Sequence, residues 1–253
     1  MNNKFTEGLL TRNKISKLSE EDTSRQQDYL EAIKSFARLT YESIYVIDYE
    51  KMAFEYVSEN PLFLCGHSPG EVLAMGYDFY FKNVPEKDLQ LLSIINQSGF
   101  DFFDQLPEGD KKAYTITYDF HLMSKDGKPM LINHKLTPLL LTSSGKMWKS
   151  ICIVSISAHP QAGNIQISKQ GTDEIWHLDT QARVWRKALK QKLTKREIEI
   201  LRLHAQGLTI NQIAERIFVA PDTVKYYRRR IFDRLNVSNI VEALSYAVNS
   251  KII

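Results

Sequence analysis

Two helix-start signals lie close together in the last quarter of the chain. Thr194 is followed three residues later by Glu197, and Thr209 is followed three residues later by Gln212. In such a pair the hydroxyl accepts a hydrogen bond from the third residue's backbone, and the third side chain reaches back to the cap. Gly207, just before the second signal, suits the left-handed conformation that ends a helix. Two short helices joined by a sharp turn are therefore predicted here.

A third helix is predicted to begin at Pro221, because proline has no N–H group to leave unsatisfied in the first helical turn. Helical spacing turns Val224, Ile231 and Leu235 inward, with Tyr227 near the edge of that stripe. A fourth helix is predicted after Ser238 or Asn239. The side chains of the third helix that are expected to face solvent are Lys225, Tyr226, Arg228, Arg229 and Arg230.

Charge divides the chain into two parts of opposite sign. Residues 186–253 hold 14 Lys and Arg against 6 Asp and Glu. The whole chain has 33 basic residues (Lys and Arg) and 30 acidic residues (Asp and Glu). Residues 1–185 therefore hold 19 basic and 24 acidic residues. A positive C-terminal part suits a phosphate backbone, because basic side chains release its counterions. A solvated face on a small helical bundle remains the alternative explanation of the basic helix.

Residues 193–250 resemble the DNA-binding domain of LuxR-type regulators, over less than a quarter of the chain. Two departures from the family pattern stand out. Ala220 occupies a position where a hydroxylated helix cap is common, which is expected to weaken the helix start by roughly 0.5–2 kcal/mol. Tyr227 stands where a histidine is common. The positions that carry the resemblance are Leu193, Thr194, Arg196, Glu197, Glu199, Leu201, Gly207, Ile213, Ala214, Thr223, Val224, Lys225, Ile231, Leu235, Val237, Glu242 and Ala243.

The resemblance implies a division of labour on the third helix. Side chains that reach base edges in the major groove would be Lys225, Tyr226 and Arg229. It further implies that two chains pair and place their third helices in successive major-groove segments of double-stranded DNA. RNA polymerase is a further partner that this family admits. Phosphate contacts would come from Thr209, Asn211, Thr223, Tyr227 and Arg230.

The N-terminal part has the pattern of an antiparallel sheet with helices. Residues 23–39 read as an amphipathic helix, either packed on its own domain or used as a dimer contact. Two strands within residues 43–58 form a hairpin, and helices follow that end near Gly76 and Gly99. Three strands come after Pro107, with turns at Asp126-Gly127 and Ser144-Gly145. This order indicates an α+β domain with helices on one face of the sheet.

Residues 40–158 resemble a PAS domain in this order and in two motifs, Lys125-Asp126-Gly127 and Gly66–Leu73. The resemblance implies a small ligand or cofactor between sheet and helices, or a role in dimerisation alone. If the Asp126-Gly127 turn is a two-residue loop, His134 lies opposite Asp119 with His121 on the same face. These three side chains are candidates for reading a ligand, or they form only a solvent-facing cross-strand pair.

The sequence predicts four segments. They are a tail with an amphipathic helix (1–39), a PAS-like α+β sensor (40–158), a linker (159–190) and an all-α four-helix LuxR-type domain (191–253). In the linker, strands flank Gln170-Gly171 and a helix is predicted through Ala182, Trp185, Ala188 and Leu189.

Several function classes are disfavoured by what the sequence lacks. Catalytic motifs such as a Gly-rich phosphate loop, HExxH or Gly-x-Ser-x-Gly are missing, and the six histidines form no metal-type cluster. Neither a signal peptide nor a run of about 18 apolar residues is seen, so no membrane partner is expected. Cys65 and Cys152 are the only cysteines, which favours a reducing cytoplasm.

The pattern as a whole predicts a one-component transcriptional regulator whose sensor controls a DNA-binding domain. A ligand-dependent interaction protein, whose basic helix binds another protein, is the alternative. A sensory enzyme with a DNA-binding tail is a third hypothesis, for which the sequence offers no catalytic residues. Steep salt dependence on duplex DNA, with sequence preference, would distinguish the first from the second.

Overall fold

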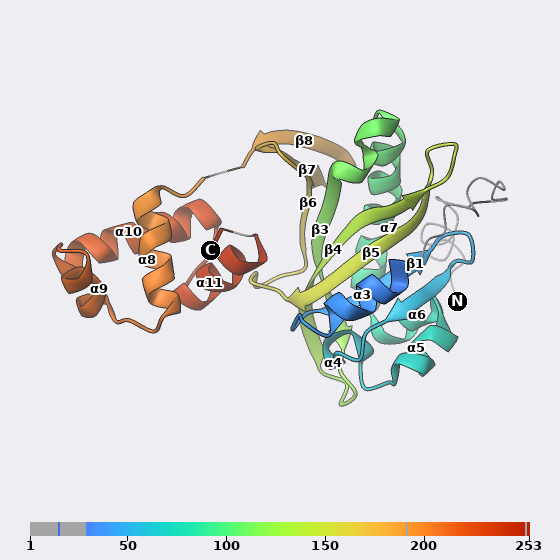
Figure 1. Cartoon of the computed structure of the whole chain (residues 1–253), viewed down its shortest axis with the longest axis horizontal. Coiled ribbons are helices and arrows are strands. Elements are labelled where there is room, and N and C mark those ends of the chain that lie inside the picture. Colours follow the sequence, from blue (N-terminus) through green and yellow to red (C-terminus); the bar gives the residue numbers. More distant parts are fainter. Residues whose placement is uncertain (1–14, 16–28, 191, 251) are drawn as a thin grey trace. The chain divides into compact units, whose positions relative to one another are not determined.

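The computed structural model describes residues 15, 29–190, 192–250 and 252–253 (Figure 1). The chain forms two compact units. Unit 1 holds the described residues up to Ile156 together with 161–188, and unit 2 holds 157–160 together with the described residues from Leu189 onward. Within the described ranges, no helix is both long and apolar enough to span a bilayer.

Unit 1 is built on one eight-stranded sheet with the strand order β2-β1-β5-β4-β3-β6-β7-β8 (Figure 1). Antiparallel pairing joins β1 to β2 and β5, β4 to β3 and β5, and β6 to β3 and β7. The predicted first hairpin and the three later strands are confirmed. The strands are β1 Ser43–Asp48, β2 Ala53–Val57, β3 Tyr114–Met123, β4 Pro129–Leu141, β5 Met147–Ile156, β6 Gly163–Lys169, β7 Glu174–Asp179 and β8 Val184–Leu189.

Helices cover both faces of this sheet, because side chains alternate along each strand. Ile44 and Val46 of β1 pack with Ile33 of α3 in a small cluster. Tyr45 and Ile47, on the other face, belong to the main core beneath the remaining helices. The helices predicted on one face are thus confirmed, and α3 adds a layer on the opposite face. The helical elements are α3 Tyr29–Ala37, α4 Pro61–Leu64, α5 Pro69–Met75, α6 Asp78–Asn83, α7 Glu86–Asp104 and the 3-10 helix η1 Glu108–Ala113.

The packing of α3 helps to decide whether residues 23–39 pack on their own domain or form a dimer contact. Its buried residue, Ile33, contacts the unit's own sheet, and Tyr29 donates a hydrogen bond to Glu55 on β2. This part of the amphipathic segment therefore packs on its own domain. Residues 23–28 of the predicted helix lie outside the described residues.

Aromatic rings fill the main core of unit 1. Tyr45 of β1 stacks on Phe63 of α4, with ring centroids 4.2 Å apart and planes 13° apart. Tyr77, Phe79 and Tyr80 are buried around this pair. Stacked and edge-on aromatic contacts add to the stability that burial alone supplies.

Two sequence predictions in unit 1 are wrong. Helix α7 does not end near Gly99 but continues to Asp104, because Phe100 and Phe103 extend its buried side by another turn. The segment predicted as a helix through Ala182 and Leu189 is instead strand β8. Residues 161–188 are therefore part of the sheet rather than a linker, and packing on the sheet outweighs local helical spacing.

Unit 2 is the predicted bundle of four short helices. Both capping boxes form: Thr194 accepts from the backbone of Glu197, and Thr209 from the backbone of Gln212, with the reciprocal bonds present. Asn239 caps the last helix through Glu242. The core is centred on the buried side chains Ile200, Leu201, Ile213, Val224 and Ile231. The helices are α8 Lys195–Ala205, α9 Ile210–Arg216, α10 Pro221–Leu235 and α11 Ile240–Asn249.

The start of α10 has no side-chain hydrogen bond at its cap, Ala220. Because a hydroxyl there would satisfy one of the first backbone N–H groups, Ala220→Ser should stabilise α10 by about 0.5–2 kcal/mol. Hydrogen exchange of the α10 amides, followed by mass spectrometry, measures this. Ala205→Ser at the exposed end of α8 is the control and should give no gain. If the α10 amides exchange equally slowly in Ala220→Ser and Ala205→Ser, the prediction is contradicted.

Candidate nucleic-acid interface

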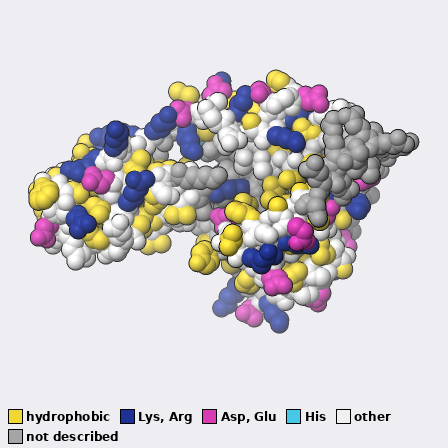
Figure 2. Space-filling view, viewed as in Figure 1, with side chains coloured by type: hydrophobic (Ala, Val, Ile, Leu, Met, Phe, Trp, Pro, Cys, Tyr) yellow, Lys and Arg dark blue, Asp and Glu magenta, His cyan; other side chains and the backbone are white. Residues whose placement is uncertain are grey.

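Three predicted base-contacting residues share one exposed face of α10. Lys225, Tyr226 and Arg229 are all exposed, and positions 225, 226 and 229 lie on one side of a helix. Tyr226 is 54% exposed, which is unusual for a large aromatic residue and leaves much of its surface accessible to a partner. Figure 2 shows dark-blue basic side chains on the surface of unit 2, at the left of the view.

The contacts made by this face are weak ones. Lys225 Nζ lies 2.9 Å from Asp222 Oδ1, and both side chains are exposed. Arg230 donates to the hydroxyl of Tyr226 at 3.1 Å, and its guanidinium lies 5.7 Å from the centroid of that ring. Surface pairs of this kind contribute little to stability. The side chains can therefore exchange these contacts for phosphates or bases at small cost.

Behind this face, a buried carboxylate joins α10 to the start of α8. Glu197 is fully buried, and its Oε2 accepts from the backbone N–H and hydroxyl of Thr194 at 2.7 and 2.9 Å. Its Oε1 faces Arg230 Nε at 3.6 Å and Arg234 Nε at 3.4 Å. Sequence reasoning assigned Glu197 only to the cap, because its spacing gives no sign of partners on a distant helix.

The turn between α9 and α10 is braced by Arg196, to which the sequence analysis gave no role. Its guanidinium donates to the carbonyl of Ile217 at 3.2 Å and to Glu199 at 2.7 Å. Phe218, the next residue in the turn, has a left-handed backbone (φ 55°) and a side chain that is 94% exposed. A bulky residue rarely adopts this conformation, so the surrounding contacts must hold the turn in place.

The predicted phosphate contacts lie at the beginning of α9 and along α10. Asn211 is exposed, whereas Thr223 and Tyr227 are half-buried. The hydroxyl of Thr209 already donates to Gln212 within the capping box, at 3.0 Å. Arg230 is shared between the surface and Glu197. Their roles as phosphate contacts stay predictions.

Arg228 does not face outward as its position in the sequence suggests. Its Nε is buried without a hydrogen-bond partner, and its guanidinium lies 5.6 Å from the ring centroid of Phe232. Burial, and then the charge of Arg228, lower the pKa of His204 on α8. Arg228 therefore packs toward the interior of unit 2.

The predicted ligand patch of Asp119, His121 and His134 does not form. Tyr118 lies opposite His134, and Asn133 opposite Asp119, one residue away from the predicted register. The turn is longer than two residues, because the Ser124 N–H donates to the Lys128 carbonyl. A shift of one residue turns every side chain to the other face of the strand.

Each of the three side chains has a local partner instead. Asp119 is fully buried and accepts from the amides of Asn133 and Asn164, both at 2.7 Å. His121 Nδ1 lies 2.8 Å from Asp88 Oδ2, which also accepts from the His121 backbone. These contacts fasten β6 and α7 to β3. Among the described residues, no group of three or more His, Cys, Asp and Glu side chains is placed to hold a metal ion.

His134 lies in the aromatic core on the opposite face. Its Nε2 is 2.6 Å from the hydroxyl of Tyr45, which is 2.7 Å from that of Tyr80, and its Nδ1 is buried without a partner. Burial lowers the pKa of His134 from 6.5 to about 3. The imidazole is therefore neutral at physiological pH.

Comparison with known proteins assigns unit 2. Residues 191–247 match the family model described as "Bacterial regulatory proteins, luxR family". Unit 2 is a LuxR-family helix-turn-helix domain. This LuxR-family domain contains every residue predicted to contact DNA, and it confirms the resemblance drawn from the sequence.

Curated relatives match between about a quarter and about half of the chain. Oxygen regulatory protein NreC of Staphylococcus epidermidis is 25% identical over 136 residues, which are 54% of this chain and 59% of the relative. The uncharacterised transcriptional regulatory protein YxjL of Bacillus subtilis is 37% identical over 65 residues, 26% of this chain and 30% of the relative. The chain thus spans less than two thirds of the length of these relatives.

Solved structures give weaker likenesses. The VqmA–ligand–DNA complex of Vibrio cholera is 16% identical over 87% of this chain and 88% of that chain, with a TM-score of 0.35. A PAS domain from Colwellia psychrerythraea is 13% identical over 51% of this chain and 97% of that domain, with a TM-score of 0.38. The PAS-like character of unit 1 rests on its own strand order and helix placement.

The buried histidine makes unit 1 sensitive to acid. Because the folded pKa of His134 is below its unfolded value, its contribution to stability is full above pH 6.5 and is lost as the pH falls toward about 3. The free energy of unfolding should fall by about 1.4 kcal/mol per pH unit in this window on account of His134. His134→Phe should remove this component of the slope.

The measurement is urea unfolding between pH 7 and pH 4, followed by tryptophan fluorescence. All three tryptophans, at 148, 176 and 185, belong to unit 1, so the signal reports that unit alone. The control is His177→Gln at an exposed position on β7, which should keep the wild-type slope. Identical slopes for His134→Phe and the wild type would show that the buried imidazole does not titrate as stated.

Proposed function

We propose that this chain is a one-component transcriptional regulator, in which α10 enters a DNA major groove and the PAS-like unit 1 controls binding. The observation that carries the proposal is the single exposed face of Lys225, Tyr226 and Arg229, in a domain of the LuxR family. Arginine and lysine can pair with the acceptor edge of guanine in the major groove. Tyrosine offers both a hydroxyl and an apolar ring.

Other residues of unit 2 would set the position of α10 on the duplex. Thr223, Tyr227 and Arg230 flank the base-contacting face, and Thr209 and Asn211 lie at the start of α9. Contacts of this kind fix register on the phosphate backbone without reading sequence. Two chains would pair and occupy two half-sites about one helical turn of DNA apart.

The proposal places the protein with the genome in the cytoplasm of a bacterium and assigns no catalytic step to either unit. RNA polymerase is a partner that such a regulator would meet at its target sites. Small-molecule control would act through unit 1, whose fold leaves room between helices and sheet.

One observation favours the alternative of a protein partner for the same surface. The ring of Phe218, beside α10, is 94% exposed, and exposed aromatic side chains are common in protein interfaces. Salt dependence separates the two proposals. Binding to duplex DNA should weaken steeply between 50 and 200 mM salt, whereas an apolar protein contact should not.

Removal of a base-contacting side chain should change sequence preference. Arg229→Ala should weaken binding to the preferred duplex by about 1–3 kcal/mol and relax base choice at one position of the site. The duplex is first selected from a random library, and affinity is then measured by fluorescence anisotropy. Arg186→Ala, an exposed arginine on β8, is the charge-matched control. Unchanged affinity in Arg229→Ala would remove this residue from the base-contacting set.

A phosphate contact should act on all sequences alike. Arg230→Ala should weaken binding to preferred and to random duplexes by the same factor. The slope of log affinity against log salt concentration should become shallower by about one. Arg234→Ala is the matched control, because Arg234 faces the same Glu197 oxygen. If the two variants lose affinity equally, Arg230 acts only by supporting the fold. A loss confined to the preferred duplex would make Arg230 a base contact instead.

A further inference from the structure

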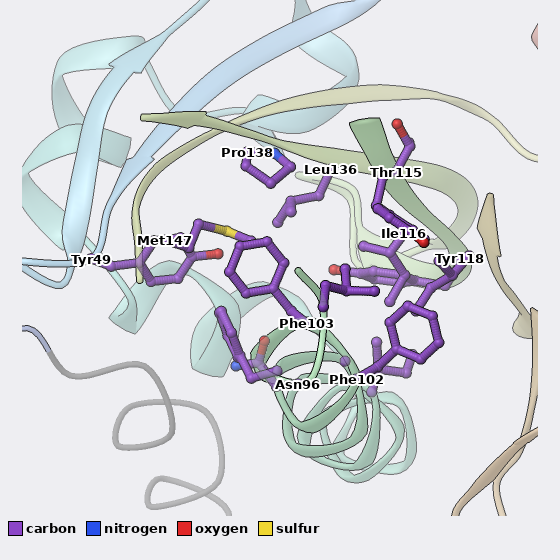
Figure 3. A pocket seen from close by; sticks show the side chains of 16 residues that line it. Tyr49, Asn96, Phe102, Phe103, Thr115, Ile116, Tyr118, Leu136, Pro138 and Met147 are labelled. Atoms are coloured by element: carbon purple, nitrogen blue, oxygen red, sulfur yellow. The ribbon is translucent and has the colours of Figure 1, made fainter. Parts of the chain in front are cut away.

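Unit 1 contains a pocket between α7 and the sheet (Figure 3). Its volume is about 60 Å³, and it is partly open to solvent. Several waters would fit, since one water requires roughly 10–15 Å³. Side chains from α7, β3 and β4 converge on it, and the ring of Phe103 lies in the middle of the view in Figure 3.

The part of the lining that the described residues supply is apolar and uncharged. Most of this wall consists of aromatic and aliphatic side chains, and among the described residues no Asp, Glu, Lys, Arg or His lines the pocket. The polar groups that do line it include the phenols of Tyr49 and Tyr118, and burial raises the pKa of both well above its usual value. Both phenols therefore stay neutral and can donate a hydrogen bond. A charged ligand would find no ion-pair partner in the wall, which is costly in a buried site.

A cation is disfavoured further by Lys111. Its ammonium group lies 4.7 Å from the ring centroid of Phe103 and donates to the carbonyl of Gly145 at 2.8 Å. The aromatic face that could attract a cationic ligand therefore already carries a positive charge nearby. The chemistry of the wall points to an uncharged molecule, mostly apolar, of about the size of one ring.

Phe102 connects this pocket to the last strands of the sheet. It lines the pocket from α7, and its ring centroid lies 5.4 Å from that of Trp176 on β7 and 5.5 Å from that of Trp185 on β8. The indole N–H of Trp185 donates to the Ser98 carbonyl of α7 at 3.0 Å. A displacement of α7 would therefore move the two tryptophans with it.

The same strands lead directly into the DNA-binding domain. Strand β8 ends at Leu189, and α8 of unit 2 is capped by Thr194, five positions later. A change in the position of β8 reaches unit 2 through this short covalent connection, whatever the arrangement of the two units.

We propose that the pocket binds a small, uncharged, largely apolar ring compound, and that Phe102 transmits its presence through Trp176 and Trp185 to the segment that enters unit 2. The binding step depends only on unit 1. The effect on DNA rests on the function proposed above.

Toluene and N-methylpyridinium test the ligand class, because they have nearly the same shape and differ in charge. Each is titrated into the full chain labelled with nitrogen-15, and the three indole N–H signals are assigned from Trp→Phe variants. Toluene should shift the Trp176 and Trp185 signals to saturation, and N-methylpyridinium should leave them in place. Equal binding of both compounds, or no saturable shift with toluene, would overturn the proposal.

Two glycine variants test the location. A side chain at Gly99 would enter the pocket, because its Cβ would lie 3.4 Å from Ile116 Cδ1. Gly99→Leu should therefore abolish the toluene response. A Cβ at Gly70, at the start of α5, would meet nothing within 4 Å, and Gly70→Leu should keep the response. A response that survives in Gly99→Leu would place toluene elsewhere.

Gly99→Ala covers the case in which leucine at this position prevents folding. It adds one methyl group inside a helix, where alanine is favoured over glycine. Its affinity for toluene should fall about fourfold, because the added methyl group displaces a volume of ligand about equal to one buried CH₂ group. Unchanged affinity in a folded Gly99→Ala protein would also place toluene outside the pocket.

The final measurement tests whether a ligand in the pocket changes the affinity for DNA. Saturating toluene should change the dissociation constant for the selected duplex about fivefold or more in the wild type and in Gly70→Leu, but not in Gly99→Leu. If toluene shifts the tryptophan signals while duplex affinity stays the same, transmission through Phe102 is wrong. If no duplex binds under any condition, the proposed DNA-binding function fails, while the ligand titrations still decide the pocket.

Discussion

A buried carboxylate holds together the part of unit 2 on which recognition depends. Glu197 caps α8 through Thr194 and faces Arg230 and Arg234 of α10. A buried charge is costly to leave unpaired, so the two arginines that face Glu197 Oε1 at 3.4 and 3.6 Å couple the middle of α10 to the start of α8. The exposed face of α10 is therefore presented by a rigid support, although its own surface contacts are weak.

Unit 1 is held together by different contacts. Strand β1 is buried along its whole length, with α3 on one face and the aromatic core on the other. One polar group in this interior has a close neighbour, since His134 Nε2 lies 2.6 Å from the hydroxyl of Tyr45. A buried lysine–carboxylate cluster, in which Lys149 Nζ lies 2.6 Å from Glu55 and 3.3 Å from Asp48, holds β5 to β1 and β2. Helix α3 joins this cluster through Tyr29.

Sequence reasoning succeeded where local chemistry decides the structure. The capping boxes at Thr194 and Thr209, the uncapped start at Ala220 and the hairpins of unit 1 all follow from a few neighbouring residues. The exposure of the α10 face follows from helical spacing alone. For these features, no knowledge of distant parts of the chain is needed.

Sequence reasoning failed where contacts with distant segments decide the structure. The candidate ligand patch depended on a two-residue turn after β3, and the longer turn that forms places His134 on the opposite face from Asp119. Residues 184–189 have helical spacing, yet they form β8, because Trp185 finds its partner on α7. The inward packing of Arg228 likewise depends on Phe232 and on the end of α8. No local pattern reports contacts of this kind.

The strand order of unit 1 also bears on how fast this unit folds compared with unit 2. Pairing of β1 with β5 joins Ser43 to Val154, which are more than a hundred positions apart. The four helices of unit 2 follow one another directly along the chain. Distant pairings must wait for a large loop to close, whereas neighbouring helices assemble rapidly. Unit 2 can therefore reach its native state on a faster timescale than unit 1, which is proposed to regulate it.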